Sequence, residues 1–252
     1  MKFSSIVRKL IMALSGLFLI IFLVTHLVIN SFTLAPSKEL FNEAAHFMAT
    51  NPVIYVMQYV LALGFIIHIA MGIKLTIQNK RARSKNYAYN QMSKNTDLSS
   101  RSMIISGGLV LVFLALHLRD YFYQMKFVGL PEGTTDYDLV VNLFSNPYYT
   151  GVYVVSFIVL GFHLNHGFQS AFQSIGANHG KYNPIIKAVS VGYSITIALG
   201  FSTIANIHFI NLFNFFKLLN FRNIINLIKL SKLSKLCKLC KLSKLSKLRK
   251  LS

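Results

Sequence analysis

Residues 10–29, LIMALSGLFLIIFLVTHLVI, decide the fold class, because they form a long apolar run without a charged side chain. An α-helix of this length spans about 30 Å, which matches the hydrocarbon core of a bilayer. Basic residues precede the run, as in a signal peptide, but the run is longer than the apolar region of such a peptide and no A-x-A-like site follows it. We therefore expect an uncleaved membrane-spanning helix.

Four further segments repeat this pattern. The chain has 252 residues, of which 54% are hydrophobic and only 13% charged, and its mean hydropathy is +0.51. Such a composition is too apolar for a soluble domain of this size. Asn–Pro steps and other turn residues separate the segments. We predict an all-α polytopic membrane protein with five transmembrane helices, with spans at 10–29, 53–77, 99–123, 149–172 and 185–209.

The formal net charge of +19 is unevenly distributed. All seven acidic residues lie before Phe216, and the basic excess occurs in short loops and in a repetitive tail, so nucleic-acid binding is a poor interpretation. The tail repeats leucine with a period of three, which leaves no lasting apolar face on a helix. We expect residues 1–215 to form the transmembrane domain and residues 216–252 to be a disordered low-complexity tail.

The loops between the spans predict the orientation. The basic stretch NKRARSK at 79–85 lies on the same side as the basic N-terminus, and the opposite side carries few lysines or arginines. The positive-inside rule then places the N-terminus in the cytoplasm, and five spans place the C-terminus outside. The basic tail conflicts with this rule. The main polar excursion is the loop 126–146.

Four of the predicted spans each contain one histidine whose depth follows from the helical rise. His26 and His117 share a level near the outer side, and His68 and His163 share one near the inner side, roughly 10–15 Å away. Two imidazoles from facing helices at each of two depths are what two bis-histidine b haems require. We therefore expect four of the five transmembrane helices to form a haem-binding four-helix core. Small residues that would leave room for the macrocycle lie one turn from the inner pair: Gly64, Gly72 and Gly167.

Other interpretations of these residues stay open. A histidine inside a membrane also hydrogen-bonds neighbouring helices, and glycines there also serve close packing. His166, one turn from His163, is the alternative fourth ligand. A zinc or non-haem iron site is disfavoured because Asp120 is the only acid within a span. His46 and His179 fall in predicted loops.

The histidines occur in four longer stretches, which are SGLFLIIFLVTHLVIN at 15–30, FIIHIAMGIKLTIQNKRAR at 65–83, SRSMIISGGLVLVFLALHLRD at 100–120 and GFHLNHGFQSAFQSIG at 161–176. In this order they resemble the di-haem cytochrome b subunit of succinate dehydrogenase and fumarate reductase. The branch that they resemble is the five-helix, single-subunit membrane anchor of bacteria such as Bacteroidota. The resemblance covers residues 4–210.

The resemblance implies an electron-transfer subunit in the bacterial cytoplasmic membrane, connecting an iron–sulfur subunit with menaquinone through two b haems. His26 and His117 would ligate the distal haem, and His68 and His163 the proximal haem. A flavoprotein and the iron–sulfur subunit would bind the cytoplasmic face near the stretch 79–85. The dicarboxylate chemistry would take place in those partners and not in this chain.

The resemblance also suggests where further ligands bind. Polar residues near the distal haem are candidates for a quinone site: Asn30, Arg119, Asp120 and Tyr121. Residues suited to haem propionates are Ser15, Arg8, Lys74 and Arg81. Some members of the family carry a glutamate two residues before the fourth-helix ligand, proposed to carry protons. This chain has Gly161 there, which leaves that proton route in doubt.

Three other functions fit part of the sequence. A cytochrome b anchor of a hydrogenase or formate dehydrogenase shares the haem chemistry, and its neighbouring genes would differ. A transporter or channel that relays protons through histidines needs a continuous polar path and broken helices, whereas these spans are nearly free of Asp, Glu and Pro. The third possibility is a purely structural membrane anchor, which a measurement of haem content would distinguish from a cytochrome.

Overall fold

The computed structural model describes residues 4–81, 98–177, 179–211, 214 and 222. Its packing divides the chain into two units, Met1–Ile207 and His208–Ser252. The first unit holds the membrane-spanning bundle described below as far as Ile207, within the fifth span. The tail predicted at 216–252 lies outside the described residues, apart from Arg222.

The regular structure of the described residues is helical throughout, which confirms the predicted all-α fold class. The helices that are long and apolar enough to cross a membrane are Ser5–Leu34, Pro52–Gln78, Met103–Val128, Pro147–Ser174 and Asn183–Asn211. Each predicted span therefore has a counterpart. The third span ends later than predicted, at Val128, because its last turns remain helical although they are polar.

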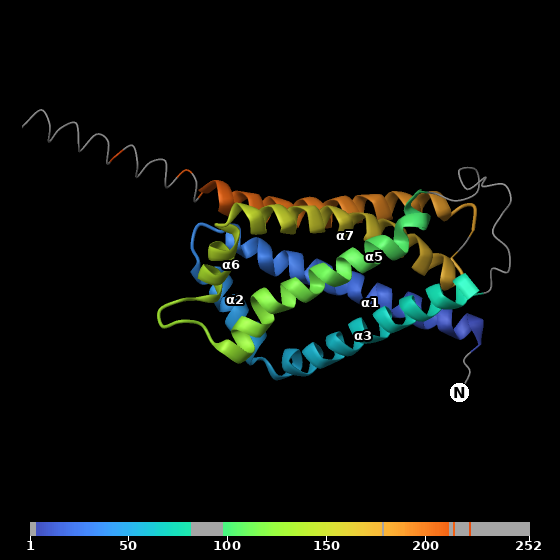
Figure 1. The fold of residues 1–252 in the computed structure, drawn as a ribbon, viewed down its shortest axis with the longest axis horizontal. Helices are drawn as coiled ribbons and strands as arrows, with labels where there is room; N and C mark the ends of the chain where they lie inside the picture. Colours follow the sequence, from blue (N-terminus) through green and yellow to red (C-terminus); the bar gives the residue numbers. More distant parts are fainter. Residues whose placement is uncertain (1–3, 82–97, 178, 212–213, 215–221, 223–252) are drawn as a thin grey trace, which may run out of the picture. The chain divides into compact units, whose positions relative to one another are not determined.

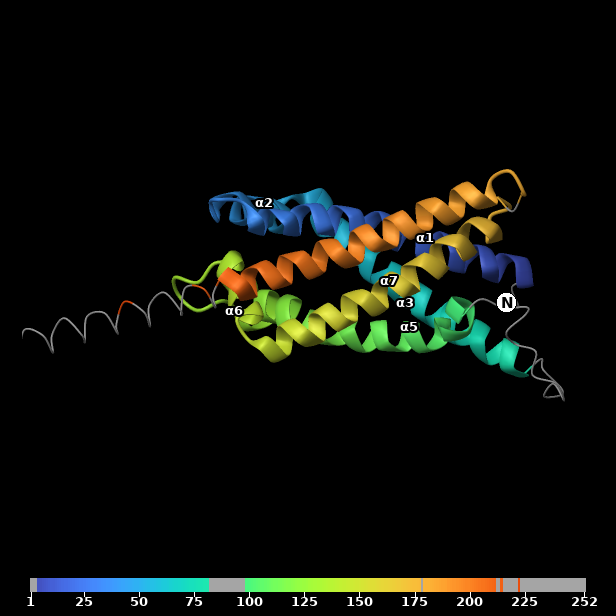
Figure 2. The same cartoon turned by 90° about the horizontal axis from the view of Figure 1, so that it is seen from above.

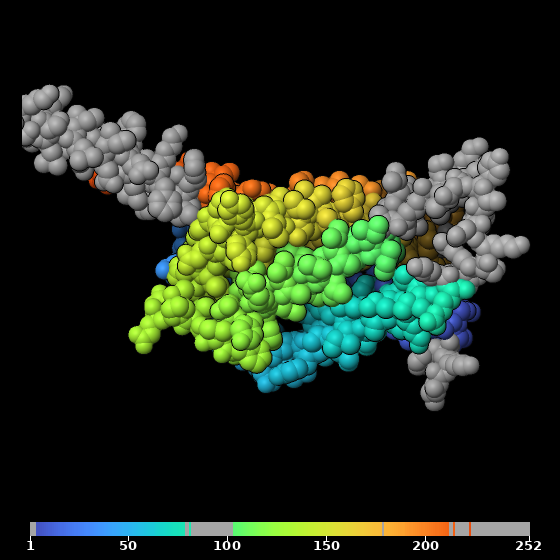
Figure 3. Space-filling model, viewed as in Figure 1, coloured from blue at the N-terminus to red at the C-terminus, as the bar shows by residue number. Residues whose placement is uncertain are grey.

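Four labelled helices form two packed pairs (Figure 1). The helix α1 (Ser5–Ser31) packs on α3 (Pro52–Arg81), and α5 (Leu98–His117) packs on α7 (Pro147–Ser174). A contact between α1 and α7 joins the two pairs. The fifth span runs beside α7 in both views (Figures 1 and 2). Figure 3 shows the face on which α7, α5 and α3 follow one another.

Asparagine–proline steps stand at the start of three spans, at Asn51, Asn146 and Asn183, as the sequence predicted. The side chain of Asn51 accepts a hydrogen bond from the backbone N–H of Val53, and that of Asn146 accepts one from Tyr148, each at 2.9 Å. The proline that follows each asparagine suits the first position of a helix, because its missing N–H has no helical partner there. These residues therefore fix where α3 and α7 begin.

Two segments expected to be loops contain helices instead. They are α2 (Glu39–Thr50), which carries the exposed His46, and α6 (Asp136–Phe144). At the start of α6, Thr135 and Asp138 form a capping box, in which the backbone N–H of Thr135 donates to the Asp138 carboxylate at 2.9 Å. These hydrogen bonds lower the pKa of Asp138. Both helices lie at the end of the bundle opposite the N-terminus and contact each other (Figures 1 and 2). His179 lies in a loop and is exposed, as predicted.

The third span changes its helix type immediately after His117. The segment η2 (Leu118–Val128) is a π-helix, and the N–H of Gly129 donates to the carbonyl of Gln124, five residues earlier, at 2.9 Å. Gly129 then ends the helix with a φ of 81°, which glycine adopts without strain. π-Helical turns are rare and are frequent at functional sites. This turn carries Asp120 and Tyr121.

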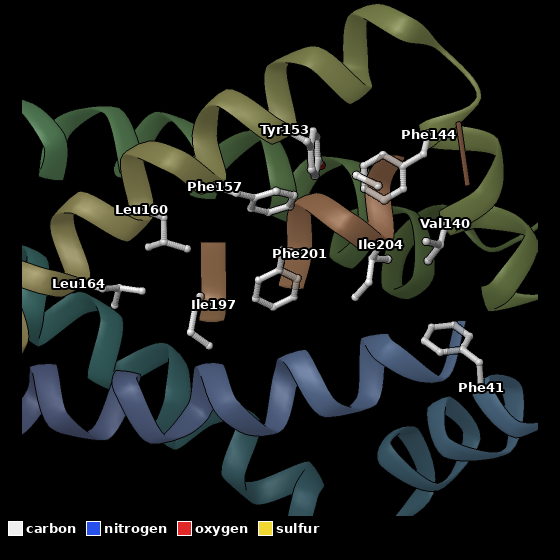
Figure 4. Close-up of a cluster of buried hydrophobic side chains, with 11 residues drawn as sticks. Phe41, Val140, Phe144, Tyr153, Phe157, Leu160, Leu164, Ile197, Phe201 and Ile204 are labelled. Carbon is white, nitrogen blue, oxygen red and sulfur yellow. The ribbon is translucent and has the colours of Figure 1, made fainter. Parts of the chain in front are cut away.

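The buried apolar core lies mainly between α7 and the fifth span, and α2 and α6 close one end of it (Figure 4). Tyr153 is 1% exposed and packs edge-on against Phe144, with ring centroids 5.4 Å apart. Phe157 of α7 stacks on Phe201 of the fifth span at 5.3 Å. Aromatic contacts of this kind fix the lateral position of α7 in the bundle.

The fifth span approaches its neighbours closely at small residues. A Cβ atom on Gly161 would lie 3.0 Å from the Cβ of Ala198, so α7 and the fifth span meet almost backbone to backbone. The hydroxyl of Tyr193 donates to the carbonyl of Ile20 in α1 at 2.8 Å. Gln169 of α7 donates to the hydroxyl of Ser190 at 2.9 Å. Polar contacts and small residues thus hold helices together where lipid removes the hydrophobic driving force.

Candidate functional site

The outer histidine pair meets between α1 and α5. The imidazole centroids of His26 and His117 lie 5.8 Å apart, with the ring planes at 89°. Aromatic rings surround the pair: Phe22 stacks on His26 at 5.2 Å, and Tyr121 lies 5.1 Å from His117. Both imidazoles are only half-buried. Each therefore presents part of its surface within a membrane-spanning segment.

The inner histidine pair meets between α3 and α7. The ring centroids of His68 and His163 lie 6.4 Å apart, with the planes at 85°. These rings are also half-buried. His166 lies one turn further along α7 and is half-buried as well. The structure thus brings together the same two pairs that were placed at common depths from the sequence.

The two pairs lie at different depths. A Cβ on Gly16 of α1 would lie 3.4 Å from Cε1 of His68, so Gly16 marks the level of the inner pair. Gly16 precedes His26 on the same helix by ten residues, which corresponds to about 15 Å along the axis. The separation lies at the upper end of the predicted range.

Serine hydroxyls face the inner pair from both sides. The Oγ of Ser15 lies 3.3 Å from Nδ1 of His68, and the Oγ of Ser106 lies 3.5 Å from Nδ1 of His163. Each hydroxyl also donates to a carbonyl of its own helix, at 3.0 Å to Met12 and 3.1 Å to Met103. Ser15 was expected near a haem propionate; the structure places its hydroxyl beside a histidine.

The donor set of each pair fits a haem iron. Two imidazoles that bind one metal ion from opposite sides, with metal–nitrogen bonds of about 2 Å, have ring centroids about 6 Å apart. No group of three or more His, Cys, Asp or Glu that would hold a metal ion occurs among the described residues. A macrocycle supplies its own four nitrogens and needs only two protein ligands. Within the same described part of the chain, Nδ1 of His117 is buried and has no hydrogen-bond partner.

The glycines beside the inner pair differ in their surroundings. A Cβ on Gly64 would lie 2.9 Å from the ring of Phe18, so that glycine accommodates a side chain. A Cβ on Gly72 would lie 3.7 Å from the Met12 methyl group, and one on Gly167 would meet no atom within 4 Å. Of the three, Gly167 leaves the most room.

The candidate quinone residues lie around the π-helix. The side chain of Asp120 is 4% exposed, and one of its oxygens lies 3.3 Å from Nε of Arg119. Its other oxygen accepts a hydrogen bond of 2.9 Å from the Tyr153 hydroxyl. Arg119 also donates to the Tyr149 hydroxyl at 3.1 Å. The buried carboxylate of Asp120 therefore has two partners, and one of them, Tyr153, also contacts the ring of His117.

The other two candidates contact the outer histidines directly. The half-buried ring of Tyr121 packs against His117. The amide of Asn30 donates to the carbonyl of His26 at 2.8 Å and lies 3.5 Å from its Nδ1. Asn30 is thus engaged mainly with its own helix.

The cationic candidates for propionates differ in burial. Nε of Arg8 is buried and has no hydrogen-bond partner within the described residues. Lys74 and Arg81 are exposed. Arg8 as a whole is half-buried, but a buried N–H without a partner is costly, and the carboxylate of a bound group would satisfy it. Arg8 is therefore the strongest of the three.

Two residues of the site were missed from the sequence. Ser106 occupies the same place relative to His163 as Ser15 does to His68, and the Ser–Gly step shared by the two helices was the available signal. Tyr153 contacts both Asp120 and the ring of His117. Nothing in its local sequence distinguishes it from the other tyrosines, because its role depends on how α7 packs on the third span.

The fold and the site together define a five-span helical membrane protein with two pairs of facing imidazoles at two depths. The chain is similar to the succinate dehydrogenase cytochrome b558 subunit of Bacillus subtilis (strain 168), with 28% identity over 151 residues. The alignment covers 60% of this chain and 69% of that protein. No family model matches the chain, and no solved structure matches it.

Proposed function

We propose that this chain is the membrane-anchoring cytochrome b subunit of a succinate dehydrogenase or fumarate reductase and binds two b haems. The two imidazole pairs carry the proposal, since their ring separations of 5.8 and 6.4 Å suit ligands on opposite sides of one iron. The similarity to the Bacillus subtilis cytochrome b558 subunit supports the choice of complex.

We assign the ligands to the two imidazole pairs and take the terms distal and proximal from the family that the sequence resembles. His26 and His117 hold the distal group, and His68 and His163 hold the proximal group. When bound, the haems supply one-electron transfer at two depths of the membrane. A flat macrocycle would bury the exposed surface of the half-buried imidazoles. Its propionate would give the buried Nε of Arg8 an anionic partner. His166 is the alternative to His163, because it lies on the adjacent turn.

The loop charges support an orientation, and the resemblance supports the partners. The basic stretch 79–85 lies in the cytoplasm of a bacterial cell together with the N-terminus, and the C-terminus lies outside. Most of that stretch falls outside the described residues. A flavoprotein and an iron–sulfur subunit bind this face, on the side of the inner pair. The chain therefore moves electrons, and its partners act on the dicarboxylate.

Menaquinone reacts near the outer pair. The site includes Asp120 and Tyr121, with Arg119 at its exposed edge and Asn30 on α1. Quinone reduction consumes protons, and Asp120 is the carboxyl group of this site, held in place by the Arg119 guanidinium and the Tyr153 hydroxyl. Lipid-facing apolar side chains around the bundle allow a hydrophobic substrate to approach.

The test is purification of the tagged full-length chain from its native membranes in mild detergent. We expect a flavoprotein and an iron–sulfur protein to co-purify, with quinone reduction that depends on succinate. Untagged membranes processed in the same way are the control. Activity with hydrogen or formate in place of succinate would contradict the proposed complex and would support an anchor of a different respiratory enzyme.

A further inference from the structure

The inner histidines have matching environments on two helices that are far apart in the sequence. Ser15–Gly16 of α1 faces His68, and Ser106–Gly107 of α5 faces His163. In each case the serine Oγ lies near Nδ1, at 3.3 and 3.5 Å. A Cβ on either glycine would lie 3.4 or 3.3 Å from Cε1 of the same imidazole.

The two helices also share their spacing. Gly16 precedes His26 by ten residues, and Gly107 precedes His117 by the same number. Each helix therefore contributes one imidazole to the outer pair and one Ser–Gly step to the inner pair. Since the same combination occurs twice around one level, chance packing of a single serine does not account for it.

The hydroxyl protons determine the direction of these contacts. Ser15 donates its proton to the carbonyl of Met12, and Ser106 donates to that of Met103. Each serine oxygen then keeps a lone pair for the imidazole, so Nδ1 carries the proton and acts as donor. This tautomer leaves the Nε2 lone pair free for a metal ion.

The two glycines determine how closely the helix backbone approaches each imidazole. Without a Cβ, the backbone of α1 and of α5 approaches the edge of the imidazole closely, and the ring cannot rotate toward it. A methyl group at 3.3–3.4 Å would displace the ring unless the helix moved. Hydroxyl and glycine together restrict both the tautomer and the tilt of the ring.

We infer that the two Ser–Gly steps are positioning elements that hold His68 and His163 in the Nδ1-protonated form and orient their Nε2 atoms toward a shared iron. This inference rests on the proposed function, because it assumes that the inner pair binds a haem. Hydrogen-bonded imidazoles are stronger electron donors to a metal, which favours the oxidised iron. Loss of the serine oxygen therefore raises the reduction potential of that haem.

The experiment is a redox titration of the α-band absorbance of the purified full-length protein, comparing Ser106→Ala, Ser106→Thr and wild type. We expect Ser106→Ala to shift the midpoint of one haem to a more positive potential and to leave the other haem unchanged. Ser106→Thr retains a hydroxyl and keeps the wild-type midpoint. Ser15→Ala shifts the same haem, because both serines face the inner pair.

The control is Ser156→Ala in α7, where the hydroxyl donates to the carbonyl of Val152 at 2.7 Å. It should leave both midpoints unchanged. A further variant, Gly107→Ala, should reduce haem retention after detergent dilution by about tenfold or more. Two haems with unshifted midpoints in both serine-to-alanine variants would overturn the inference and leave the proposed function standing. A wild type without haem would overturn the proposed function itself.

Discussion

The hydroxyl of Tyr153 in α7 donates a hydrogen bond of 2.9 Å to the buried carboxylate of Asp120 in the π-helix, beside His117. The bond ties the irregular end of the third span to the core cluster at a point where both groups are shielded from water. A carboxylate oxygen buried at this depth needs a donor, and few are available in an apolar bundle.

Replacing Tyr153 with phenylalanine tests this hydrogen bond. The variant keeps the aromatic packing but leaves a buried carboxylate oxygen without its donor, so we expect a loss of about 1–3 kcal/mol in stability. Thermal unfolding in detergent would measure it. Tyr149→Phe is the matched control, because the Tyr149 hydroxyl accepts from the exposed Arg119. Equal stability of the two variants would show that the tie to Asp120 contributes nothing.

Asp120→Asn tests the quinone site. The amide has the shape of the carboxylate but does not accept and release protons, so we expect slower quinone reduction with an unchanged haem content. Stopped-flow oxidation of the reduced haems by a menaquinone analogue measures the rate. Glu132→Gln, in the exposed turn after the π-helix, removes the same charge away from the site. Equal rates in both variants would remove Asp120 from the site.

The choice between His163 and His166 depends on haem content. Loss of an axial ligand from one pair should remove one haem and leave the other, so His163→Ala should retain one of the two. His166→Ala should retain both, because its ring is not required for the pair that lies 6.4 Å apart. Pyridine haemochrome spectra per mole of chain provide the measurement. The reverse pattern would transfer the ligand role to His166.

Close packing at Gly161 makes a different prediction. A Cβ there would lie 3.0 Å from the Ala198 Cβ and 3.4 Å from the Ser194 carbonyl, so Gly161→Ala forces α7 and the fifth span apart. Overpacking of this kind costs about 1–3 kcal/mol. Ala198→Gly should restore part of the stability in the double variant, because it removes the opposing methyl group. If unfolding of the double variant in detergent is merely additive, the two helices do not meet at this position.

The same contact bears on the glutamate that the resemblance led us to look for at this position. A glutamate side chain at Gly161 would need space that the fifth span occupies. The acid that lies within the described spans is Asp120, in the π-helix after His117 and at the opposite end of the bundle from the N-terminus. A proton route through α7 at the position of Gly161 therefore lacks both the carboxylate and the room for one.

Much of the fold was predictable because membrane spans depend on local composition. The five apolar runs and the Asn51 and Asn146 caps follow from hydropathy and from the chemistry of helix starts. The helix α6 was missed although Thr135 and Asp138 carry the capping-box pattern, because a polar loop was expected there. The helix α2 was missed because its apolar residues form too short a run for a span.

The candidate site was also predictable only in part. Histidine depth depends only on helical rise, so the pairing of His26 with His117 was predictable. The partners of those histidines were not, since the contact of Ser106 with His163 depends on helix rotation and lateral packing. The π-helix was equally unpredictable, because no local residue pattern requires it.

The most direct test of the central claim is the number of b haems in the purified, full-length wild-type chain. Pyridine haemochrome absorbance divided by the protein concentration from amino-acid analysis gives this ratio. Two imidazole pairs with ring centroids 5.8 and 6.4 Å apart predict two haems per chain. A chain that is folded and helical but contains no haem would contradict the account.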